Sequence, residues 1–283
     1  MMNLMRKNGL IFLLTQVIMA ACTCKAEPIE DEIPLSVDPD CSLQSGTWWQ
    51  PQPGDTLQWQ LTGKLDLTVD ADIYDIDLFE TSAKEIRALH YANRKVICYI
   101  SVGTREDFRP DADGFPPEVI GKPYIGWPGE RWLDIRRFER FAPVMEARLD
   151  LAASKCCDGI EPDNMDGYDS DTGFAISRAD QLAYLRWLID QSHQRGLSIG
   201  MKNSPELAAD LVDDFDWALL EDCTPDGWCA AFTPFTRQGK TVFQVAYTDR
   251  VSDLDAFCPQ AGENGFSGLL KHRNLDDWLL LCP

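Results

Sequence analysis

Apolar runs of strand length recur along the chain from Leu57 onward, and most of them are followed by a stretch of helix length. The predicted strands are Leu57–Leu61, Ala71–Phe79, Lys95–Gly103, Asp158–Asn164, Leu197–Asn203, Trp217–Cys223, Thr241–Thr248 and Phe266–Arg273. Apolar residues at helical spacing predict helices over Ala142–Lys155, Ala179–Arg195 and Leu207–Phe215. This alternation is typical of an α/β fold, and we expect a single-domain (β/α)8 TIM barrel. A doubly wound open sheet is the alternative, although no GxGxxG turn follows the first strand.

One connection between predicted strands is much longer than the others. Residues 104–140 contain five prolines together with Trp127 and Trp132. Long connections of this kind usually cover or line a site. Because the segment follows the third predicted strand, a barrel would place it at the carboxyl ends of the strands, where the active sites of such barrels lie.

The first residues of the chain have the features of an export signal. Arg6 and Lys7 precede an apolar run over residues 10–21 that is too short to span a bilayer permanently. We therefore predict a signal peptide over residues 1–21 and expect the protein outside the cell or in the cell envelope. The tetrapeptide that ends in Cys22 resembles a bacterial lipobox, which predicts lipidation of Cys22. The alternative is ordinary cleavage nearby, with Cys22 or a neighbouring cysteine in a disulfide.

The chain after the signal divides into a short tether and one large domain. Residues 22–40 are rich in Glu, Asp, Pro and Ser and have little to bury, which is typical of a flexible tether. Residues 41–283 have the usual length of one barrel, and we predict that they form the functional domain. No second apolar segment of the sequence is long enough to cross a membrane, so we expect membrane contact only through a lipid anchor.

The chain is strongly acidic. It contains 46 Asp and Glu residues against 26 Lys and Arg residues, for a formal net charge of -20 at pH 7. Such a surface repels nucleic acid and anionic lipid and attracts polycations, so we predict no nucleic-acid partner. Plain solubility would also explain the charge, which therefore supports a cationic substrate only together with other observations.

Ten cysteines in an exported chain predict disulfides. Cys223 and Cys229 are close enough in sequence to close a small loop, whereas Cys98 lies inside a predicted strand and is expected to be a buried thiol. The further candidates for disulfides are Cys41, Cys156, Cys157, Cys258 and Cys282. No CxxC pair or histidine cluster provides the ligand spacing of a zinc site, and no motif implies a cofactor, so we expect neither a metal nor a cofactor.

Two of the predicted strands end in acidic residues. In the strand that begins at Asp158, alternate side chains share a face, so Glu161 and Asp163 would both point into a barrel. Asp163 is the better placed to reach a substrate, and Glu161 would orient it or set its pKa. Glu221 ends a strand two positions further round and can face Asp163 across the barrel mouth. Two such carboxylates are the minimum equipment for hydrolysing a glycosidic bond. The alternative is that these acids cap neighbouring elements or form a solvated loop.

Glu161 is also a weaker candidate for a substrate contact, and others lie at other predicted strand ends. Asp75 belongs to an acidic strand end, where a hydrogen-bonding role inside the barrel is equally expected. Lys202 would favour ionised carboxylates nearby or form a salt-bridged core residue, and Asn203 can donate to a sugar hydroxyl. Aromatic rings stack on sugar faces. The aromatic candidates near the proposed site are Trp48, Trp49, Trp59, Tyr99, Trp127, Trp132 and Tyr247, with Tyr99 and Tyr247 predicted as substrate contacts.

At these residues the sequence resembles glycoside hydrolase family 114, the endo-α-1,4-polygalactosaminidases with a TIM-barrel catalytic domain. The matching segments are Trp59–Gly63, Tyr74–Phe79, Cys98–Gly103, Trp127–Asp134, Asp158–Asn164, Gly196–Asn203 and Glu221–Cys223. The resemblance implies an extracellular hydrolase that cleaves α-1,4-linked galactosamine in partly deacetylated polysaccharide, with Asp163 and Glu221 as its catalytic carboxylates. Where members of the family tend to carry Glu before the tyrosine of the seventh strand, this chain has Ala246, a difference expected to affect substrate contacts.

We therefore predict a secreted or lipid-anchored endo-glycosidase, acting as a monomer on a galactosamine-rich polymer without a cofactor. If the enzyme retains configuration, Asp163 would be the nucleophile and Glu221 the general acid/base. A carboxyl separation of about 5 Å would indicate retention, and one of about 6.5–9.5 Å inversion. The alternatives are a non-catalytic lipoprotein that binds amino-sugar polymer, and a hydrolase of another α-linked sugar.

Overall fold

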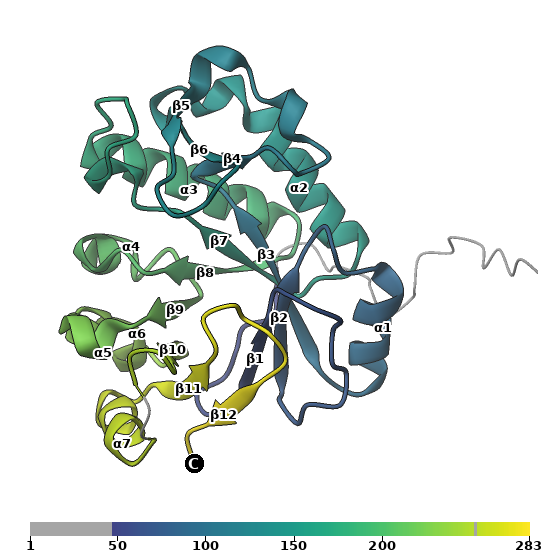
Figure 1. Cartoon of the computed structure of the whole chain (residues 1–283), viewed down its shortest axis with the longest axis vertical. Helices are drawn as coiled ribbons and strands as arrows, with labels where there is room; N and C mark the ends of the chain where they lie inside the picture. Colours follow the sequence, from purple (N-terminus) through teal and green to yellow (C-terminus); the bar gives the residue numbers. More distant parts are fainter. Residues whose placement is uncertain (1–46, 252–253) are drawn as a thin grey trace, which may run out of the picture. The chain divides into compact units, whose positions relative to one another are not determined.

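The computed structural model describes residues 47–251 and 254–283 (Figure 1). The predicted signal peptide, the tether and Cys22 lie outside the described residues. The eight predicted strands are all present, as β1 (Leu57–Gln60), β2 (Ile73–Asp77), β3 (Lys95–Ser101), β7 (Gly159–Asp163), β8 (Ser198–Lys202), β9 (Trp217–Glu221), β10 (Val242–Tyr247) and β11 (Ser267–Lys271). Each strand pairs in parallel with the next one in this order.

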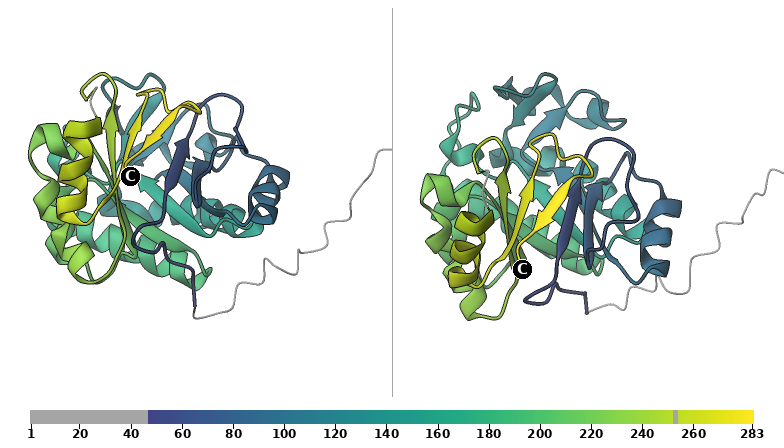
Figure 2. Two further views of the ribbon diagram at one scale, coloured as in Figure 1. Left: turned by 90° about the horizontal axis from the view of Figure 1, so that it is seen from below. Right: turned by 60° about the horizontal axis from the view of Figure 1, so that its bottom comes forward.

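The sheet curves into a barrel whose last gap is closed by a short additional strand and by side chains. β12 (Leu279–Leu281) runs antiparallel to β11 at the edge of the sheet. The yellow β11–β12 hairpin lies next to the purple β1 in both views of Figure 2. The N–H of Leu61 donates to the carbonyl of Leu275 at 2.9 Å, and Lys271 Nζ donates to Oε1 of Gln58, also at 2.9 Å. The predicted (β/α)8 TIM barrel is thus confirmed as a nearly closed barrel.

Helices follow most of the barrel strands. They are α1 (Ala83–Tyr91), α2 (Ala142–Ser154), α3 (Arg178–Gln194), α4 (Ala208–Leu211), α5 (Cys223–Asp226), α6 (Thr233–Arg237) and α7 (Leu254–Asn264). α1 and α3 both begin with a capping box, in which Ser82 and Ser177 exchange hydrogen bonds with the acidic residue three positions later. The bounds of α2 and α3 confirm the helices predicted over residues 142–155 and 179–195.

The third predicted helix is shorter than its pattern suggested. A 3-10 turn over Pro205–Leu207 leads into α4, which ends at Leu211 rather than at Phe215. Beyond it the chain turns so that the carbonyl oxygens of Val212 and Phe215 accept hydrogen bonds from Lys240 Nζ. A tertiary contact has therefore replaced the last helical turn.

The long connection after β3 folds into an insertion with its own sheet. β4 (Thr104–Glu106), β5 (Ile120–Pro123) and β6 (Glu130–Leu133) pair antiparallel in the order β4-β6-β5. Three 3-10 helices accompany them, at Ala112–Gly114, Pro117–Val119 and Ile135–Arg140. The N–H of Leu133 donates to the carbonyl of Gly103 at 2.9 Å. A Cβ at Gly103 would lie 1.7 Å from the carbonyl oxygen of Asn164, so only glycine lets the end of β3 pack this closely against the end of β7.

The barrel has an inner and an outer apolar core. The inner cluster is formed by inward side chains of the strands, among them Trp59, Ile97, Trp217 and Val245. The outer cluster lies between the strands and the helices and includes Ile160 of β7. Among the described residues, no helix is both long enough and apolar enough to cross a membrane.

Three disulfides tie described parts of the chain together. They join Cys98 to Cys157, Cys223 to Cys229, and Cys258 to Cys282. The small loop predicted for Cys223 and Cys229 is confirmed. The prediction of a buried free thiol at Cys98 is wrong, because parallel pairing of β3 with β7 brings Cys157, which lies two residues before β7, against the outer face of β3.

Candidate active site

Three neighbouring strands end abruptly at the barrel mouth. The residue after β7 is Asn164 with φ of 63°, the residue after β8 is Asn203 with φ of 47°, and the residue after β9 is Asp222 with φ of 53°. Asn and Asp tolerate this left-handed conformation better than most other residues except glycine. Strained backbone positions of this kind cluster at functional sites. The last strand residues are thereby left at the mouth, namely Asp163, Lys202 and Glu221.

Lys202 lies at the centre of a cluster of carboxylates. Its Nζ is 2.6 Å from Oε1 of Glu161, 3.1 Å from Oδ1 of Asp163 and 3.2 Å from Oε2 of Glu221. Only 3% of its side chain is exposed. Burial by itself would lower the pKa of Lys202, but the three carboxylates outweigh it and raise that pKa well above its ordinary value. The ammonium group is therefore a permanent positive charge between the two predicted catalytic acids.

The two predicted catalytic acids remain partly open to solvent. The side chains of Asp163 and Glu221 are 24% and 27% exposed. Tyr99 donates its hydroxyl to Oδ2 of Asp163 at 3.1 Å. Glu221 accepts from the hydroxyl of Tyr247 and, at 3.0 Å, from Nδ2 of Asn203. Burial raises the pKa of Glu221, but the charge of Lys202 and these hydrogen bonds outweigh it and lower the pKa below its ordinary value.

Two further acids lie beneath this layer. Asp75 and Glu161 have no exposed surface, and neither lines the cavity described below. Trp59 Nε1 donates to Oε2 of Glu161 at 3.0 Å, whereas no group of the described residues donates to either oxygen of Asp75. Burial and the charge of Glu161 raise the pKa of Asp75 well above its ordinary value, so a neutral Asp75 can donate its proton to Glu161. Burial raises the pKa of Glu161 itself to about 7, although Lys202 opposes the shift.

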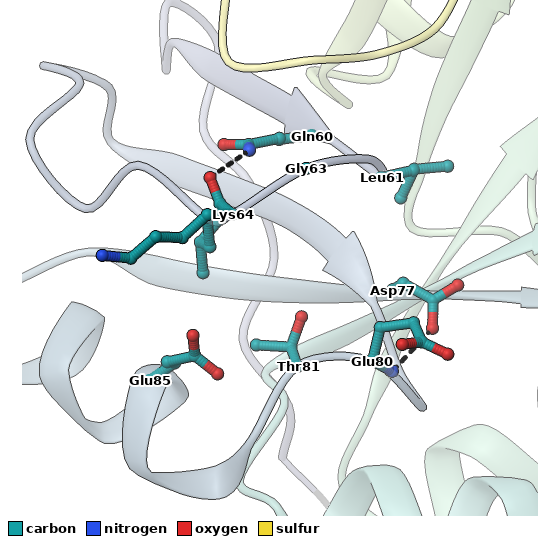
Figure 3. A pocket seen from close by; sticks show the side chains of 9 residues that line it. Gln60, Leu61, Gly63, Lys64, Asp77, Glu80, Thr81 and Glu85 are labelled. Atoms are coloured by element: carbon teal, nitrogen blue, oxygen red, sulfur yellow. Dashed lines mark hydrogen bonds between the residues drawn. The ribbon is translucent and has the colours of Figure 1, made fainter.

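A cavity of about 680 Å³ opens above the cluster. Six of the eight residues predicted from the sequence as site residues line it: Tyr99, Asp163, Lys202, Asn203, Glu221 and Tyr247. Asp75 and Glu161 can affect a bound ligand only through the residues above them. A smaller pocket of about 100 Å³ shares Leu61, Asp77 and Glu80 with this cavity. Figure 3 shows Glu80 beside Asp77 in the smaller pocket.

The predicted aromatic residues separate into two groups. Trp59 and Trp127 line the cavity together with the two tyrosines. Trp48 instead stacks on His193 with ring centroids 3.8 Å apart and donates to Asp216, the residue that precedes β9. Lys95, the first residue of β3, places its Nζ over the ring of Trp49, 5.8 Å from the ring centroid. Trp48 and Trp49 therefore lie at the amino ends of the strands, opposite the cavity.

Sequence reasoning missed most of the cavity wall that the insertion supplies. These lining residues are Glu106, Phe108, Arg109, Tyr124, Pro128 and Glu130. The length and proline content of the segment did indicate a site-covering role, but no local pattern marked which side chains point inward. Trp132, which was a candidate, is buried and packs edge-on against Tyr124.

Ala246, the position that departs from the family pattern, points away from the cavity. Its side chain is 1% exposed and belongs to a small cluster with Phe257 and Leu270. The adjacent Tyr247 points to the opposite face of β10 and lines the cavity, as alternation along a strand requires. The Ala therefore changes the outer packing of β10 and not the cavity lining.

The cavity carries an excess of negative charge. Seven carboxylates line it, those of Asp77, Glu80, Glu106, Glu130, Asp163, Asp166 and Glu221. Three cationic side chains line it, those of Arg109, Lys202 and Arg273. A concave site with this imbalance attracts cations and raises their local concentration.

The sequence and the fold were compared with known proteins. Residues 39–283 match the model of glycoside-hydrolase family GH114. The structure is similar to that of Aspergillus fumigatus Ega3 in complex with galactosamine, with 37% sequence identity and a TM-score of 0.79 over 83% of this chain and 98% of that one. It is also similar to the glycoside hydrolase domain of PelA from Pseudomonas aeruginosa, with 14% identity and a TM-score of 0.65 over 80% and 97% of the two chains. A GH18 chitinase from Pseudoalteromonas aurantia shares the fold at 12% identity and a TM-score of 0.50, over 77% and 93%. No curated protein matched.

Proposed function

The chain belongs to glycoside hydrolase family GH114, and from this premise we infer that it cleaves a cationic, galactosamine-containing polysaccharide with Asp163 and Glu221 as its catalytic pair. That it is a glycoside hydrolase follows from the family. The observation that carries the choice of residues is the placement of both carboxylates, partly exposed, on one ammonium group at the mouth of the barrel.

Two observations support an amino sugar as the substrate. Ega3, which is 37% identical, was crystallised in complex with galactosamine. The cavity of this chain is lined by seven carboxylates and three cationic groups, which suits a sugar that carries a protonated amine. A polymer with α-1,4-linked galactosamine units is therefore the proposed substrate, cleaved within the chain as the resemblance to the family implies.

The shared ammonium group sets an upper limit on the separation of the two proposed catalytic carboxylates. Oδ1 of Asp163 and Oε2 of Glu221 both lie within 3.2 Å of Lys202 Nζ, so these oxygens cannot be farther apart than twice that distance. Carboxyl groups of inverting enzymes are separated by about 6.5–9.5 Å to leave room for a water, and those of retaining enzymes by about 5 Å. We propose the retaining class, which this upper limit allows.

In a retaining mechanism the two acids act in two steps. In its protonated form, Glu221 would first donate its proton to the glycosidic oxygen while an oxygen of Asp163 attacks the anomeric carbon, so that the leaving sugar departs with the proton. Because the pKa of Glu221 is lowered in the free protein, Glu221 must take up this proton from solvent before the first step. Glu221 would then take a proton from water, whose oxygen displaces Asp163 and restores both carboxyl groups. Tyr247 and Asn203 position Glu221, Tyr99 and Lys202 position Asp163, and Asp75 and Glu161 act through Lys202.

The function can be tested on the protein without its first 22 residues. The substrate is partly deacetylated α-1,4-galactosaminogalactan, and the products are analysed by mass spectrometry. We expect galactosamine oligomers, and a loss of about a thousandfold or more in rate for Asp163→Asn and for Glu221→Gln. Asp169→Asn, an exposed acid in the same connection as Asp163 that does not line the cavity, is the matched control. Intact polymer after incubation with the wild type would refute the substrate, and near-normal rates in both variants would refute the catalytic pair.

We also propose that the enzyme works as a monomer outside the cytoplasm, anchored through a lipid on Cys22. The three disulfides support export, because such bonds persist in oxidising compartments. The lipobox-like tetrapeptide supports the anchor. Cys22→Ala should move the protein from the membrane fraction to the soluble fraction of the cell envelope, and an unchanged distribution would exclude the anchor.

A further inference from the structure

Two glutamates on the insertion face each other across neighbouring strands. Glu106 of β4 is paired directly with Glu130 of β6. Directly opposed residues of an antiparallel pair point to the same face, with Cβ atoms about 4.5–5.5 Å apart, and like charges there are destabilising. Both side chains line the cavity, although the residues are only 2% and 7% exposed. A buried like-charged pair that breaks this rule indicates a functional site rather than a structural one.

The cations near this pair are already engaged. Arg109 makes a bidentate pair with Asp77, at 2.9 and 2.6 Å, and its Nη2 is 2.9 Å from Oε1 of Glu106. Arg148 binds both oxygens of Asp111, at 2.7 and 2.9 Å, and lies 4.0 Å from Oε2 of Glu106. Oε2 of Glu106 is buried and has no hydrogen-bond partner within the described part of the chain.

Glu130 has even fewer cationic side chains near it than Glu106 has. Its Oε2 accepts a hydrogen bond from the hydroxyl of Thr104 at 2.7 Å, and no described ion pair includes it. Burial raises the pKa of Glu130 to about 7, against the hydrogen bond from Thr104, and the charge of Glu106 adds to the shift. Among the described ion pairs the carboxylate of Glu130 has no cationic partner, so a cation that enters from the cavity would stabilise its charge.

The pair is connected to the catalytic centre by a short hydrogen-bonded chain. Nδ2 of Asn164, the residue after Asp163, donates to Oγ of Ser101 at 3.0 Å and to Oγ1 of Thr104 at 3.2 Å. Thr104 in turn donates to Glu130. A group bound at Glu130 would thus lie in the same cavity as the proposed nucleophile and contact a side chain that is hydrogen-bonded to its neighbour in sequence.

We propose that Glu130 and Glu106 form a subsite that binds the ammonium group of a substrate sugar and so selects units with a free amine over N-acetylated ones. This inference rests on the proposed function and adds the residues that read the acetylation state. An ammonium group would donate hydrogen bonds to Glu130 and to the unpartnered oxygen of Glu106, replacing the missing cation. The exposed rings of Phe108 and Trp127, which also line the cavity, supply faces for the sugar. An N-acetyl group carries no charge and would leave Glu130 without a positively charged partner, while Glu106 would keep its ion pair with Arg109.

The test compares the affinities of two ligands for catalytically inactive variants. Binding of an α-1,4-galactosamine oligomer and of its fully N-acetylated counterpart is measured by calorimetry, with Asp163→Asn as the common background. Adding Glu130→Gln should weaken binding of the free-amine oligomer by about ten- to a hundredfold, the range for a charge-assisted hydrogen bond. Binding of the N-acetylated oligomer should change by less than about twofold. Glu106→Gln should reduce the same selectivity by a smaller factor, because Arg109 already holds one of its oxygens.

Glu139→Gln is the matched control, since Glu139 is an exposed acid of the same region that does not line the cavity. Thermal unfolding of each variant shows whether the fold is intact, and Gln at 130 can still accept from Thr104. Equal weakening for both ligands, or none for either, in both glutamate variants would overturn the proposal. If the wild type cleaves the polymer although both glutamate variants give that result, the proposed function stands and only the proposed subsite is wrong. If the Asp163→Asn protein binds neither oligomer and the wild type cleaves no polymer, the proposed function falls with it.

Discussion

Replacing Lys202 by methionine removes a buried cation that three carboxylates share. Nζ lies between 2.6 and 3.2 Å from Glu161, Asp163 and Glu221, and the side chain is 3% exposed. Removing one partner of a buried ion pair costs about 3–5 kcal/mol, because it leaves an uncompensated charge. With three carboxylates on one ammonium, we expect a loss of about 4–5 kcal/mol in the free energy of unfolding at pH 8, together with loss of hydrolysis.

The size of this loss should depend on pH through Glu161. Burial raises the pKa of Glu161 to about 7 even with Lys202 beside it, and the pKa must rise further without the ammonium group. A carboxyl whose folded-state pKa exceeds its unfolded-state pKa is most favourable to folding when protonated, and it loses stability as the pH rises through the folded-state value. The deficit of Lys202→Met should therefore be smaller at pH 5 than at pH 8.

Urea unfolding followed by tryptophan fluorescence at pH 5 and pH 8 measures both quantities. Lys122→Met is the control, because Lys122 is 53% exposed and pairs with Asp171 at 2.6 Å on the surface, where such pairs contribute at most about 1 kcal/mol. If Lys202→Met were no less stable than Lys122→Met at pH 8, the charge balance described for the site would be wrong. A deficit of the same size at both pH values would show that Glu161 does not titrate as described.

Three other changes test separate parts of the site and the fold. Tyr247→Phe removes a donor that lowers the pKa of Glu221, so the alkaline limb of kcat/KM should move to higher pH if Glu221 is the general acid; an unmoved limb would reassign that role. Asp75→Asn should change the free energy of unfolding by less than about 1 kcal/mol, since the neutral amide can replace a neutral acid, and a loss above about 3 kcal/mol in urea unfolding would mean that Asp75 is ionised. The double change Cys98→Ala with Cys157→Ala should lower the unfolding free energy by about 2–4 kcal/mol and leave KM unchanged, and a raised KM would connect this disulfide to the cavity.

Local patterning was sufficient for the strands and for the direction of their side chains. The alternation of Glu161 and Asp163 with Ile160 predicted which of them face the barrel interior, and Ile160 indeed packs in the outer core. The same argument holds for Glu221, whose neighbour Leu220 also belongs to the outer core. These predictions succeeded because the two-residue period of a strand is a property of the backbone itself.

Depth along a strand was harder to predict than direction. Asp75 was expected among the substrate contacts, yet it lies below the cavity floor with no exposed surface. Trp48 and Trp49 were expected near the site but lie at the opposite end of the barrel. Sequence position does not show how far each strand is shifted relative to its neighbours, and this shift decides which residues of a barrel reach its mouth.

The sequence by itself determined the order of the strands, their inward faces and the two acidic strand ends, because each of these depends on a few adjacent residues. Only the tertiary structure decided that Cys98 meets Cys157, that the insertion forms a sheet, and that Glu106 faces Glu130 in the cavity wall. Each of these contacts joins residues that are far apart in the chain or lie on separate strands. Their formation depends on how whole elements pack, which no local period or propensity contains.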